Sequence, residues 1–465
     1  MFTYQDFIAE QNVKKALNEA INAHLNSNDY KAAKDADLYD HQRNKTIYEY
    51  VHMIFSLTGA PIEDFTASNN KIASNFFRRL NTQRVTYLLG NGISFAENEK
   101  LKDQLGDKFD TKLKNLAYYA LIHGVAFGFW NVSGIHVFKL TEFMPLWDEE
   151  TGALRAGIRF WQIDEHKPMF AVLYEEDGFT KYKSNVSNGE FEEIQPKRAY
   201  QITVRQSVAD GEEVIGEDNY GILPIIPMWG SELKQSTLIG MQRSIDSFDL
   251  IRSGFANDLT DCAQIYWILS NAGGMSDKEL AQFRDRLKLA HVAVVDTDNS
   301  AATPYTQEVP YTARQVYLSE IRSGIYEDFG GLDVHAIAAG ATNDHIDAAY
   351  QPMDEQADDL EYQVIEFMDQ LLSLLGLEND TPIFKRNRIS NQAEQTAMVL
   401  SASEYLDEET VLKKLPFITV DEVVDILKKK DAEDESRFEV DEIDSENQNA
   451  QEGQNSAPNE EVVNE

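Results

Sequence analysis

The stretch that decides the fold is Gly330-Gly331-Leu332-Asp333-Val334-His335-Ala336-Ile337-Ala338-Ala339-Gly340-Ala341-Thr342-Asn343-Asp344-His345. Its glycines and alanines carry small side chains that make few anchoring contacts, so we expect a mobile loop over 330–345. The segment after it carries apolar residues at alternating spacings of four and three, which predicts a long helix within 346–377 with one buried stripe. The stripe consists of Ile346, Tyr350, Met353, Ala357, Leu360, Val364, Phe367 and Leu371. A mobile loop on stiff supports suggests a part that slides or gates.

Two further helices precede this loop. Apolar residues at helical spacing predict one helix from about Ser236 to Cys262 and another from Pro310 to Phe329. Between them we expect a small α/β insert, with strands over 265–269 and 291–295 and a helix over 276–289 that begins at a capping box. Pro352 lies near the start of the long helix, and we favour a kink there over a first turn because the apolar stripe continues upstream.

The rest of the chain predicts an α+β fold that is mainly helical. The first 115 or so residues show amphipathic helical periodicity, and a further helix is expected over 110–129, where Gly124 and Gly128 permit close approach of another backbone. From Trp130 to Ile226 short alternating runs predict an antiparallel β region. Pro224 and Pro227 should end it, because proline is excluded from central strands. A strand over 383–389 and helices over 391–403 and 420–430 follow.

Charge narrows the possible functions. The chain has 465 residues, enough for two or three domains, and carries 42 basic and 79 acidic residues for a net charge of −37. The segment 431–465 holds 13 acidic residues and one basic residue, and its composition predicts disorder. Because the first 430 residues are also strongly acidic, the protein should not grip DNA tightly. It is therefore either unrelated to nucleic acid or a protein that DNA passes without adhering.

Other features exclude whole classes of protein. The single cysteine, Cys262, rules out an intrachain disulfide framework, and its neighbours Leu259 and Ile265 favour a buried thiol. No apolar run is long enough for a membrane span and no secretory signal is apparent, so we expect a soluble protein made in the cytosol.

Recognisable catalytic and cofactor motifs are missing. There is no G-x-x-x-x-G-K-[ST] phosphate loop and no zinc-ligand spacing, while Asp296 and Asp298 have the surroundings of an ordinary turn. We therefore predict no enzyme activity, no cofactor and no metal. The alternative is an acidic enzyme with a dispersed site, for which Asp164, Glu165 and His166 are the best cluster. Consecutive residues on a strand point to opposite sides, so these three converge only if they lie in a turn.

The order of elements resembles portal proteins of tailed bacteriophages that infect Gram-positive hosts. The shared order is helix, α/β insert, helix, small-residue loop, long kinked helix, strand, and a helix opened by Asn391-Gln392-Ala393-Glu394. Local matches are Tyr87-Leu88-Leu89-Gly90-Asn91-Gly92, Leu223-Pro224 through Ser236, Asp246-Ser247-Phe248-Asp249 through Ser253-Gly254-Phe255-Ala256-Asn257-Asp258, and Phe384-Lys385-Arg386-Asn387. The resemblance covers about 76–418.

The resemblance implies a homo-oligomeric ring of about 12 subunits at a capsid vertex, through which double-stranded DNA is packaged and ejected. The chain would dock the terminase large subunit and later the neck or adaptor protein, contact major capsid and scaffold proteins, and contact DNA only transiently and non-specifically. It would assemble in the host cytoplasm, become part of the virion, and have no membrane partner. Another phage neck or scaffold protein is the remaining alternative.

The portal resemblance also assigns the regions of the chain. They are a wing over 1–233 (helical shell plus antiparallel β region), a first stem helix over 234–262, a clip over 263–308, a second stem helix over 309–329, a tunnel loop over 330–345, a long kinked helix over 346–377, a wing strand over 378–390, a crown over 391–430 and a disordered acidic tail over 431–465. A tail this long and acidic departs from the family pattern.

Candidate site residues follow from these regions. In the tunnel loop His335, Asn343, Asp344 and His345 would face DNA, with capping of the next helix as the alternative role of His345. Arg314 and Arg322 on the second stem helix would form basic rings once repeated by symmetry, and the alternative for each is a solvated or ion-paired side chain. Arg284, Arg286 and Lys288 on the insert helix would dock the motor or neck protein. The cluster Lys385-Arg386-Asn387-Arg388 is interpreted as an intersubunit salt-bridge strip and not as a DNA site.

Overall fold

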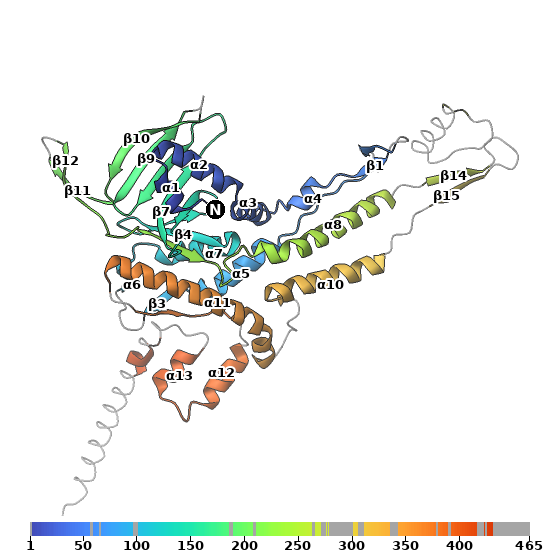
Figure 1. Ribbon diagram of the computed structural model, residues 1–465. Coiled ribbons are helices and arrows are strands. Elements are labelled where there is room, and N and C mark those ends of the chain that lie inside the picture. The colour runs from blue at the N-terminus through green and yellow to red at the C-terminus, as the bar shows by residue number, and fades with distance from the viewer. Residues whose placement is uncertain are drawn as a thin grey trace, which may run out of the picture. The chain divides into compact units, whose positions relative to one another are not determined.

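The computed structural model of the chain (Figure 1) describes residues 2–55, 59–64, 67–95, 101–185, 189–207, 211–262, 266–270, 276, 278, 301–305, 311–334, 343–377, 380–388, 392–415, 423 and 426–430. The chain divides into two compact units. The first comprises Met1–Asp333 and Gln351–Asn387, and the second comprises Val334–Tyr350 and Arg388–Glu465. Helices and antiparallel sheets are both present, so the predicted α+β class is confirmed.

The N-terminal region is helical, as predicted. Its helices are α1 (Tyr4–Ala9), α2 (Val13–Asn26), α3 (Asn28–Asp40) and α4 (Lys45–Glu49). Thr3 and Asp6 form a reciprocal capping box on α1, and the side chains of Asn12 and Ser27 cap α2 and α3. These caps satisfy backbone N–H groups that a helix start leaves without partners. A short hairpin of β1 (Met53–Phe55) and β2 (Pro61–Glu63) follows α4.

The predicted helix over 110–129 is confirmed over 110–123 and is wrong over 124–129. The elements here are α5 (Phe76–Leu89), β3 (Ile93–Phe95), α6 (Leu101–Gln104), α7 (Phe109–His123) and β4 (Val125–Trp130). Gly124 has a φ of 88°, a left-handed conformation that ends a helix at glycine and redirects the chain into a strand. The close approach predicted at this residue is confirmed, since a Cβ there would lie 2.9 Å from the backbone of Gln235.

The β region is antiparallel, as predicted, and contains more strands than the sequence indicated. Its remaining strands are β5 (Ile135–Lys139), β6 (Phe143–Trp147), β7 (Leu154–Trp161), β8 (Phe170–Glu175), β9 (Gly178–Ser184), β10 (Phe191–Arg198), β11 (Gln201–Ser207), β12 (Gly211–Asp218) and β13 (Ile225–Trp229). They form a five-stranded sheet in the order β10-β9-β8-β7-β6, a three-stranded sheet in the order β13-β4-β5, and the pair β11-β12.

Prolines mark the edges of these sheets. Pro145, Pro196 and Pro227 lie in β6, β10 and β13, each of which is an edge strand. The expectation that Pro227 closes the β region is therefore corrected, because β13 continues the sheet by pairing with β4. An edge position leaves one side of the strand without a hydrogen-bonded neighbour, so the N–H that proline lacks is not needed there.

The two helices predicted on either side of the α/β insert are both present. They are α8 (Leu238–Cys262) and α10 (Tyr311–Phe329), which pack against each other, with the strand pair β14 (Tyr266–Ser270) and β15 (Ala301–Tyr305) between them in sequence. The strand predicted over 265–269 is confirmed with a shift of one residue. Its partner is 301–305. The strand predicted over 291–295 lies outside the described residues, and so does the helix predicted over 276–289 except for residues 276 and 278.

A polar seam fixes α8 to the extended segment 70–74. The backbone N–H groups of Ser74, Ile72 and Asn70 donate to the side chains of Asp249, Ser253 and Asn257 over 2.8, 3.0 and 2.6 Å. Two extended residues advance about 6.6–6.8 Å and four helical residues about 6 Å, so the two repeats nearly match. Chain segments 175 to 187 residues apart are thereby aligned antiparallel to one another.

The long helix α11 (Asn343–Leu375) contains Pro352 inside it and not at its first turn, and all eight residues of the predicted stripe are buried. In the first unit Leu360, Val364, Phe367 and Leu371 join the central core with α5, α7 and the three-stranded sheet. Phe367 packs where Gly128 leaves room, since a Cβ there would lie 2.8 Å from its ring. The strand β16 (Pro382–Phe384) pairs with β3 and is shorter than the predicted 383–389.

The second unit contains short helices. Its described helices are α12 (Gln392–Ser401) and α13 (Glu408–Lys414), and residues 426–430 are also helical. The helices predicted over 391–403 and 420–430 thus have described helical counterparts, whereas α13, capped by Asp407, was not predicted. The segment 431–465 lies outside the described residues.

Candidate functional site at the helical hairpin

The hairpin of α8 and α10 is closed by apolar packing and one ion pair. Phe255 on α8 and Tyr311 on α10 have ring centroids 5.8 Å apart, and Arg314 forms an ion pair with Asp258 while its guanidinium lies 5.9 Å from the Phe255 ring. Arg314 was predicted to face DNA. Its charge is already compensated within the chain, which is the ion-paired alternative considered for it, and its exposure to DNA stays a prediction.

Arg322 has a comparable environment. Its guanidinium lies 2.9 Å from the carboxylate of Asp333 and 5.2 Å from the ring of Tyr326. Because Asp333 is the third residue after the α10 stop at Gly330, this ion pair ties the end of the described loop segment back to the helix. The arginine therefore positions the loop start, whether or not it also meets DNA.

The start of the loop is anchored and not loose. Gly330 has a φ of 64°, its N–H donates to the carbonyl of Glu327 over 3.1 Å, and the N–H of Gly331 donates to that of Tyr326 over 2.8 Å. These two bonds are the Schellman arrangement that ends helices at a left-handed glycine. Leu332 is buried. The expectation of a mobile loop is therefore corrected for the described residues 330–333.

Two residues of α5 hold this loop start. The side-chain amide of Gln83 donates to the carbonyl of Leu332 over 3.0 Å and accepts its N–H over 3.2 Å, so it pairs with the backbone as a neighbouring strand does. Arg84 donates to the carbonyl of Phe329 over 3.0 Å and lies 4.6 Å from the Phe329 ring. Burial lowers the pKa of Arg84 to about 10. Sequence reasoning missed both residues, since nothing local distinguishes them from other polar residues of an amphipathic helix.

The helix that follows the loop, α11, begins earlier than predicted. Asn343, Asp344 and His345 were assigned to the tunnel loop, and they are the first residues of α11. Asp344 and His345 are exposed there. An acidic residue in the first turn favours a helix start, which explains why the helix extends upstream of the apolar stripe. His335 lies outside the described residues.

The surface of α11 is strongly acidic. The helix carries nine carboxylates and neither lysine nor arginine. Three of these carboxylates, on Asp354, Asp358 and Glu361, bind the guanidinium of Arg386, and Asp354 also accepts from Tyr87 over 2.5 Å. Burial opposes the charge of Arg386, but the hydrogen bonds outweigh it and raise its pKa above the ordinary value.

The interpretation of 385–388 as an intersubunit strip therefore needs correction at two positions. Arg386 forms ion pairs with carboxylates on α11 of its own chain. In the second unit, Arg388 lies 3.0 Å from the carboxylate of Asp347. No feature of the sequence matches these arginines with carboxylates 25 or more residues away. Arg284, Arg286, Lys288, Asp296, Asp298 and the side chain of Cys262 lie outside the described residues.

The alternative enzyme site has no enclosed geometry. Asp164, Glu165 and His166 lie in a turn between β7 and β8, where the Asp164 carboxylate accepts the backbone N–H of His166 over 2.9 Å. The side chains of Glu165 and His166 are 88% and 87% exposed, so solvent surrounds both. The three residues do meet in a turn, but as a solvated surface cluster.

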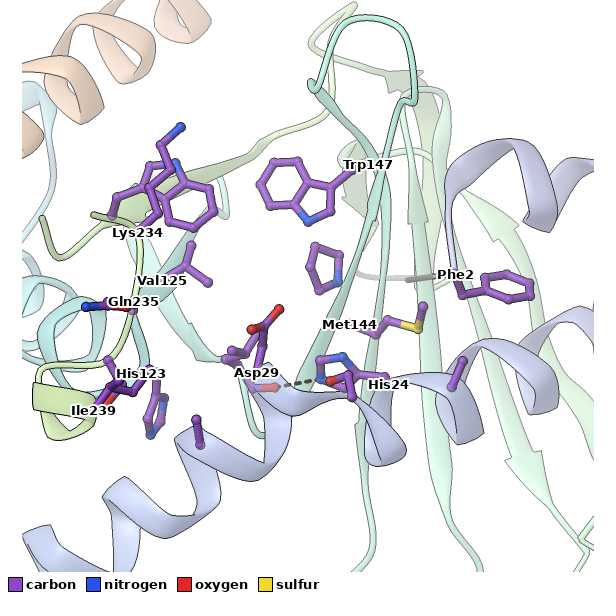
Figure 2. Close-up of a pocket in the computed structure, with 18 residues that line it drawn as sticks. Phe2, His24, Asp29, His123, Val125, Met144, Trp147, Lys234, Gln235 and Ile239 are labelled. Atoms are coloured by element: carbon purple, nitrogen blue, oxygen red, sulfur yellow. Dashed lines mark hydrogen bonds between the residues drawn. The ribbon is translucent and has the colours of Figure 1, made fainter. Parts of the chain in front are cut away.

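A small pocket lies elsewhere, between the N-terminal helices and the β region (Figure 2). Its volume is about 90 Å³, against roughly 300 Å³ or more for typical small-molecule sites. His24 borders it, and its ring N–H donates to the carbonyl of Leu140 over 2.8 Å. Burial lowers the pKa of His24, which favours the neutral ring. Within the described part of the chain no cluster of three or more His, Cys, Asp or Glu side chains is arranged for a metal ion.

Comparison with known proteins identifies the chain. A family described as "Phage portal protein, SPP1 Gp6-like" matches residues 21–451, so the protein belongs to this family of phage portal proteins. The portal protein of Clostridium phage phiCD119 is 24% identical over 388 residues, covering 76% of this chain and 82% of the relative. The portal protein of Bacillus phage SPP1 is 23% identical over 404 residues, covering 78% and 76%. The resemblance to portal proteins of phages with Gram-positive hosts is confirmed.

The family is one of structural phage proteins and not of enzymes. Among the described residues, none of the helices has an apolar stretch long enough to cross a membrane.

Proposed function

We propose that the protein forms a closed ring of about 12 subunits at one capsid vertex, and that double-stranded DNA is packaged and later ejected through the channel of this ring. Membership of the portal family is the observation that carries the proposal. The hairpin of α8 and α10 and the anchored start of the following loop add support, because they give a stiff frame to a segment that would line a channel.

Electrostatics gives the proposal a physical basis. A channel wall with many carboxylates repels the phosphate backbone and offers few sites for long-lived contacts, so a duplex can translate along it. The nine carboxylates of α11 and the internal pairing of Arg314, Arg322 and Arg386 reduce the number of free cations near such a wall. Contacts between DNA and the residues assigned to the tunnel loop, His335, Asn343, Asp344 and His345, would then be brief and non-specific.

The regions keep their proposed roles in this scheme. The wing is 1–233 with 378–390, the stem helices are α8 and α10, the clip is 263–308, the tunnel loop begins at 330, and the crown is 391–430. The clip would dock the terminase large subunit during packaging and the neck or adaptor protein afterwards, through Arg284, Arg286 and Lys288. Major capsid and scaffold proteins would surround the wing as the particle assembles in the host cytoplasm.

Deleting residues 336–341 tests the proposal. The described anchors at 330–333 and the start of α11 at 343 remain, so we expect normal expression and normal oligomer mass, with DNA packaging or retention strongly reduced. A portal protein lacking residues 445–450, an equally long deletion in the acidic tail, is the control. Normal packaging by the 336–341 deletion would contradict the assignment of the tunnel loop.

A second experiment tests docking. Reversing the charges at Arg284, Arg286 and Lys288 together should weaken binding of the purified protein to terminase without changing its thermal unfolding. Reversal of the three exposed lysines Lys14, Lys31 and Lys34 on α2 and α3 is the control for net charge. Equal terminase affinity of the reversed and unaltered proteins would remove the docking role.

A further inference from the structure

A short hairpin arm extends from the first unit, and its apolar side chains are exposed. We use the name arm for residues 50–64, which include β1 and β2. Met53, Ile54, Phe55 and Ile62 are 47%, 45%, 76% and 48% exposed, so in the described part of the chain neither face of this two-stranded sheet is buried. An isolated two-stranded hairpin is marginally stable in water at best. An arm with apolar side chains on both faces therefore needs a partner surface.

The arm also carries little charge, and its two acidic residues, Glu63 and Asp64, lie at its end. From Tyr50 to Ile62 the sequence contains no aspartate, glutamate, lysine or arginine, in a chain whose net charge is −37. Tyr48 and Tyr50 beside it are half exposed. Tyrosine and large aliphatic residues without charge are typical of the centres of protein–protein interfaces.

A second surface of the same kind lies on α10. Its outer face, the side turned away from α8, carries Val316 and Tyr317, which are 60% and 47% exposed, and Tyr311, whose ring also contacts Phe255 of α8, is 56% exposed. Between 311 and 319 the one charged residue is Arg314, and Asp258 already pairs with it. The other exposed positions from 312 to 319 are Thr312, Ala313, Gln315 and Ser319, all uncharged, and the exposed Glu320 follows them.

The two surfaces lie on opposite sides of α8 and at the same level. At 100° per residue, Asp249, Ser253 and Asn257 define one face of α8, which the polar seam joins to the segment leading out of the arm. Phe255 and Asp258 define the opposite face, where α10 packs. Figure 1 accordingly shows α4 and β1 on one side of α8 and α10 on the other.

The level of each surface along α8 is fixed by contacts near its C-terminal end. The side chain of Asn70, six residues after the arm, donates to Thr260 over 3.3 Å. Asp258, one half-turn away, pairs with Arg314, which lies between Tyr311 and Val316 in α10. One subunit therefore presents two charge-poor apolar surfaces at equal height on its two flanks.

We propose that the arm of one subunit packs onto the outer face of α10 of the next subunit in the ring. The inference rests on the proposed ring. In a rotationally symmetric ring each subunit offers one flank to its left neighbour and the other to its right, and residues at equal height meet. Subunits that each carry a net charge of −37 repel, so they have to meet where charge is absent.

The area involved suits such a contact. An aromatic side chain offers roughly 200 Å², so the exposed fractions on the two surfaces together amount to on the order of 1,000 Å² of mostly apolar area. Specific interfaces bury about 1,200 Å² or more in total, so this contact would form the larger part of one. A flank-to-flank contact repeated around the ring needs no further partner protein.

Disulfide cross-linking tests the contact directly. In a Cys262→Ser background, Phe55→Cys and Val316→Cys in one chain cannot join to each other, because α8 lies between them. Oxidation should instead give a ladder of cross-linked multimers ending at the size of the ring. A mixture of the two single-cysteine proteins should give dimers and nothing larger. A doubly substituted protein that assembles into rings but shows no ladder would overturn the proposal.

Charge substitution gives an independent measurement. Phe55→Asp and Tyr317→Asp, each alone, should raise the protein concentration needed for half-assembly by about tenfold or more, because each places a charge in an apolar contact. Ile163→Asp, at a side chain 86% exposed in the turn after β7, is the matched control and should leave assembly unchanged. Assembly that tolerates both arm and α10 substitutions contradicts the proposed contact. If the unaltered protein forms no ring at all, the proposed function fails together with this inference.

Discussion

The helices α8 and α10 form one hairpin, yet their surroundings differ. α8 is covered on two opposite faces, by the polar seam to 70–74 and by α10. α10 is covered on the side of α8 and exposes Val316 and Tyr317 away from it. Both of these faces of α8 find their partners within the chain, whereas the exposed apolar side chains of α10 indicate an interaction that a second copy supplies.

The two contacts of α8, with α10 and with segment 70–74, also have different roles. The apolar contact with α10 contributes stability through burial but tolerates sliding, because dispersion and the hydrophobic effect are non-directional. The polar seam adds direction, since each N–H of 70–74 must meet one particular side-chain oxygen. Asp249 is fully buried and Ser253 nearly so, which makes a mismatched register costly.

The largest effect is expected when the seam is broken. Asp249→Ala removes the acceptor for Ser74 N–H and for the amide of Asn44, both of which are buried, and should lower the free energy of unfolding by about 3 kcal/mol. Urea titration followed by circular dichroism measures it. Ser247→Ala, an exposed position on the same helix, should change it by less than about 0.5 kcal/mol. Equal behaviour of the two variants would show that α8 does not depend on the seam.

The next effect concerns the junction of α10 with the loop. Gly330→Ala forces a side chain into a left-handed conformation and places its Cβ 2.7 Å from Gln356 and 3.0 Å from the carbonyl of Pro352, so we expect a loss of about 2 kcal/mol. Gly324→Ala, inside α10 with no atom within 4 Å of the new Cβ, should instead stabilise by up to about 1 kcal/mol. Thermal unfolding of both variants gives the comparison. Stabilisation by Gly330→Ala would rule out the anchored loop start.

The pH dependence of stability tests the protonation of Asp249 in the polar seam. Burial raises the pKa of Asp249, so the folded protein binds that proton more tightly than the unfolded chain does. Its contribution to stability is therefore present below the ordinary pKa of 3.8 and is lost as pH rises through the raised folded pKa. Relative to the unaltered protein, Asp249→Asn should gain stability as pH rises from about 3 to 7. A difference that does not change with pH would contradict a raised pKa.

The smallest effect is expected at the ion pair of Arg322 and Asp333, whose side chains are 33% and 17% exposed. Solvent screens this pair, so a double-mutant cycle with Arg322→Met and Asp333→Asn should give a coupling energy below about 1 kcal/mol. A coupling energy of several kcal/mol would mean that the ion pair, and not the Schellman turn with Gln83 and Arg84, holds the loop start.

The sequence predicted those parts of the fold that depend on local periodicity. The stripe of α11 is buried at every predicted residue, and α8 and α10 lie within a few residues of their predicted bounds. Periodicity failed where a single backbone conformation decides the outcome. At Gly124 the apolar run continues unchanged from helix into strand, and only the left-handed φ separates them.

Long-range polar contacts could not be predicted from the sequence. Segment 70–74 carries no feature that points to α8, and the basic cluster at 385–388 does not reveal that Arg386 binds three carboxylates on α11. The same limit applies to the candidate site. The sequence singled out Arg314 and Arg322 by charge and missed Gln83 and Arg84, because the role of these two depends on where the α10 backbone ends.

Negative-stain imaging of the purified full-length protein, with its mass determined in the same preparation, tests the central claim most directly. We predict particles of about 12 chains with a central channel and rotational symmetry. Monomers or dimers without a channel at micromolar concentration would contradict it.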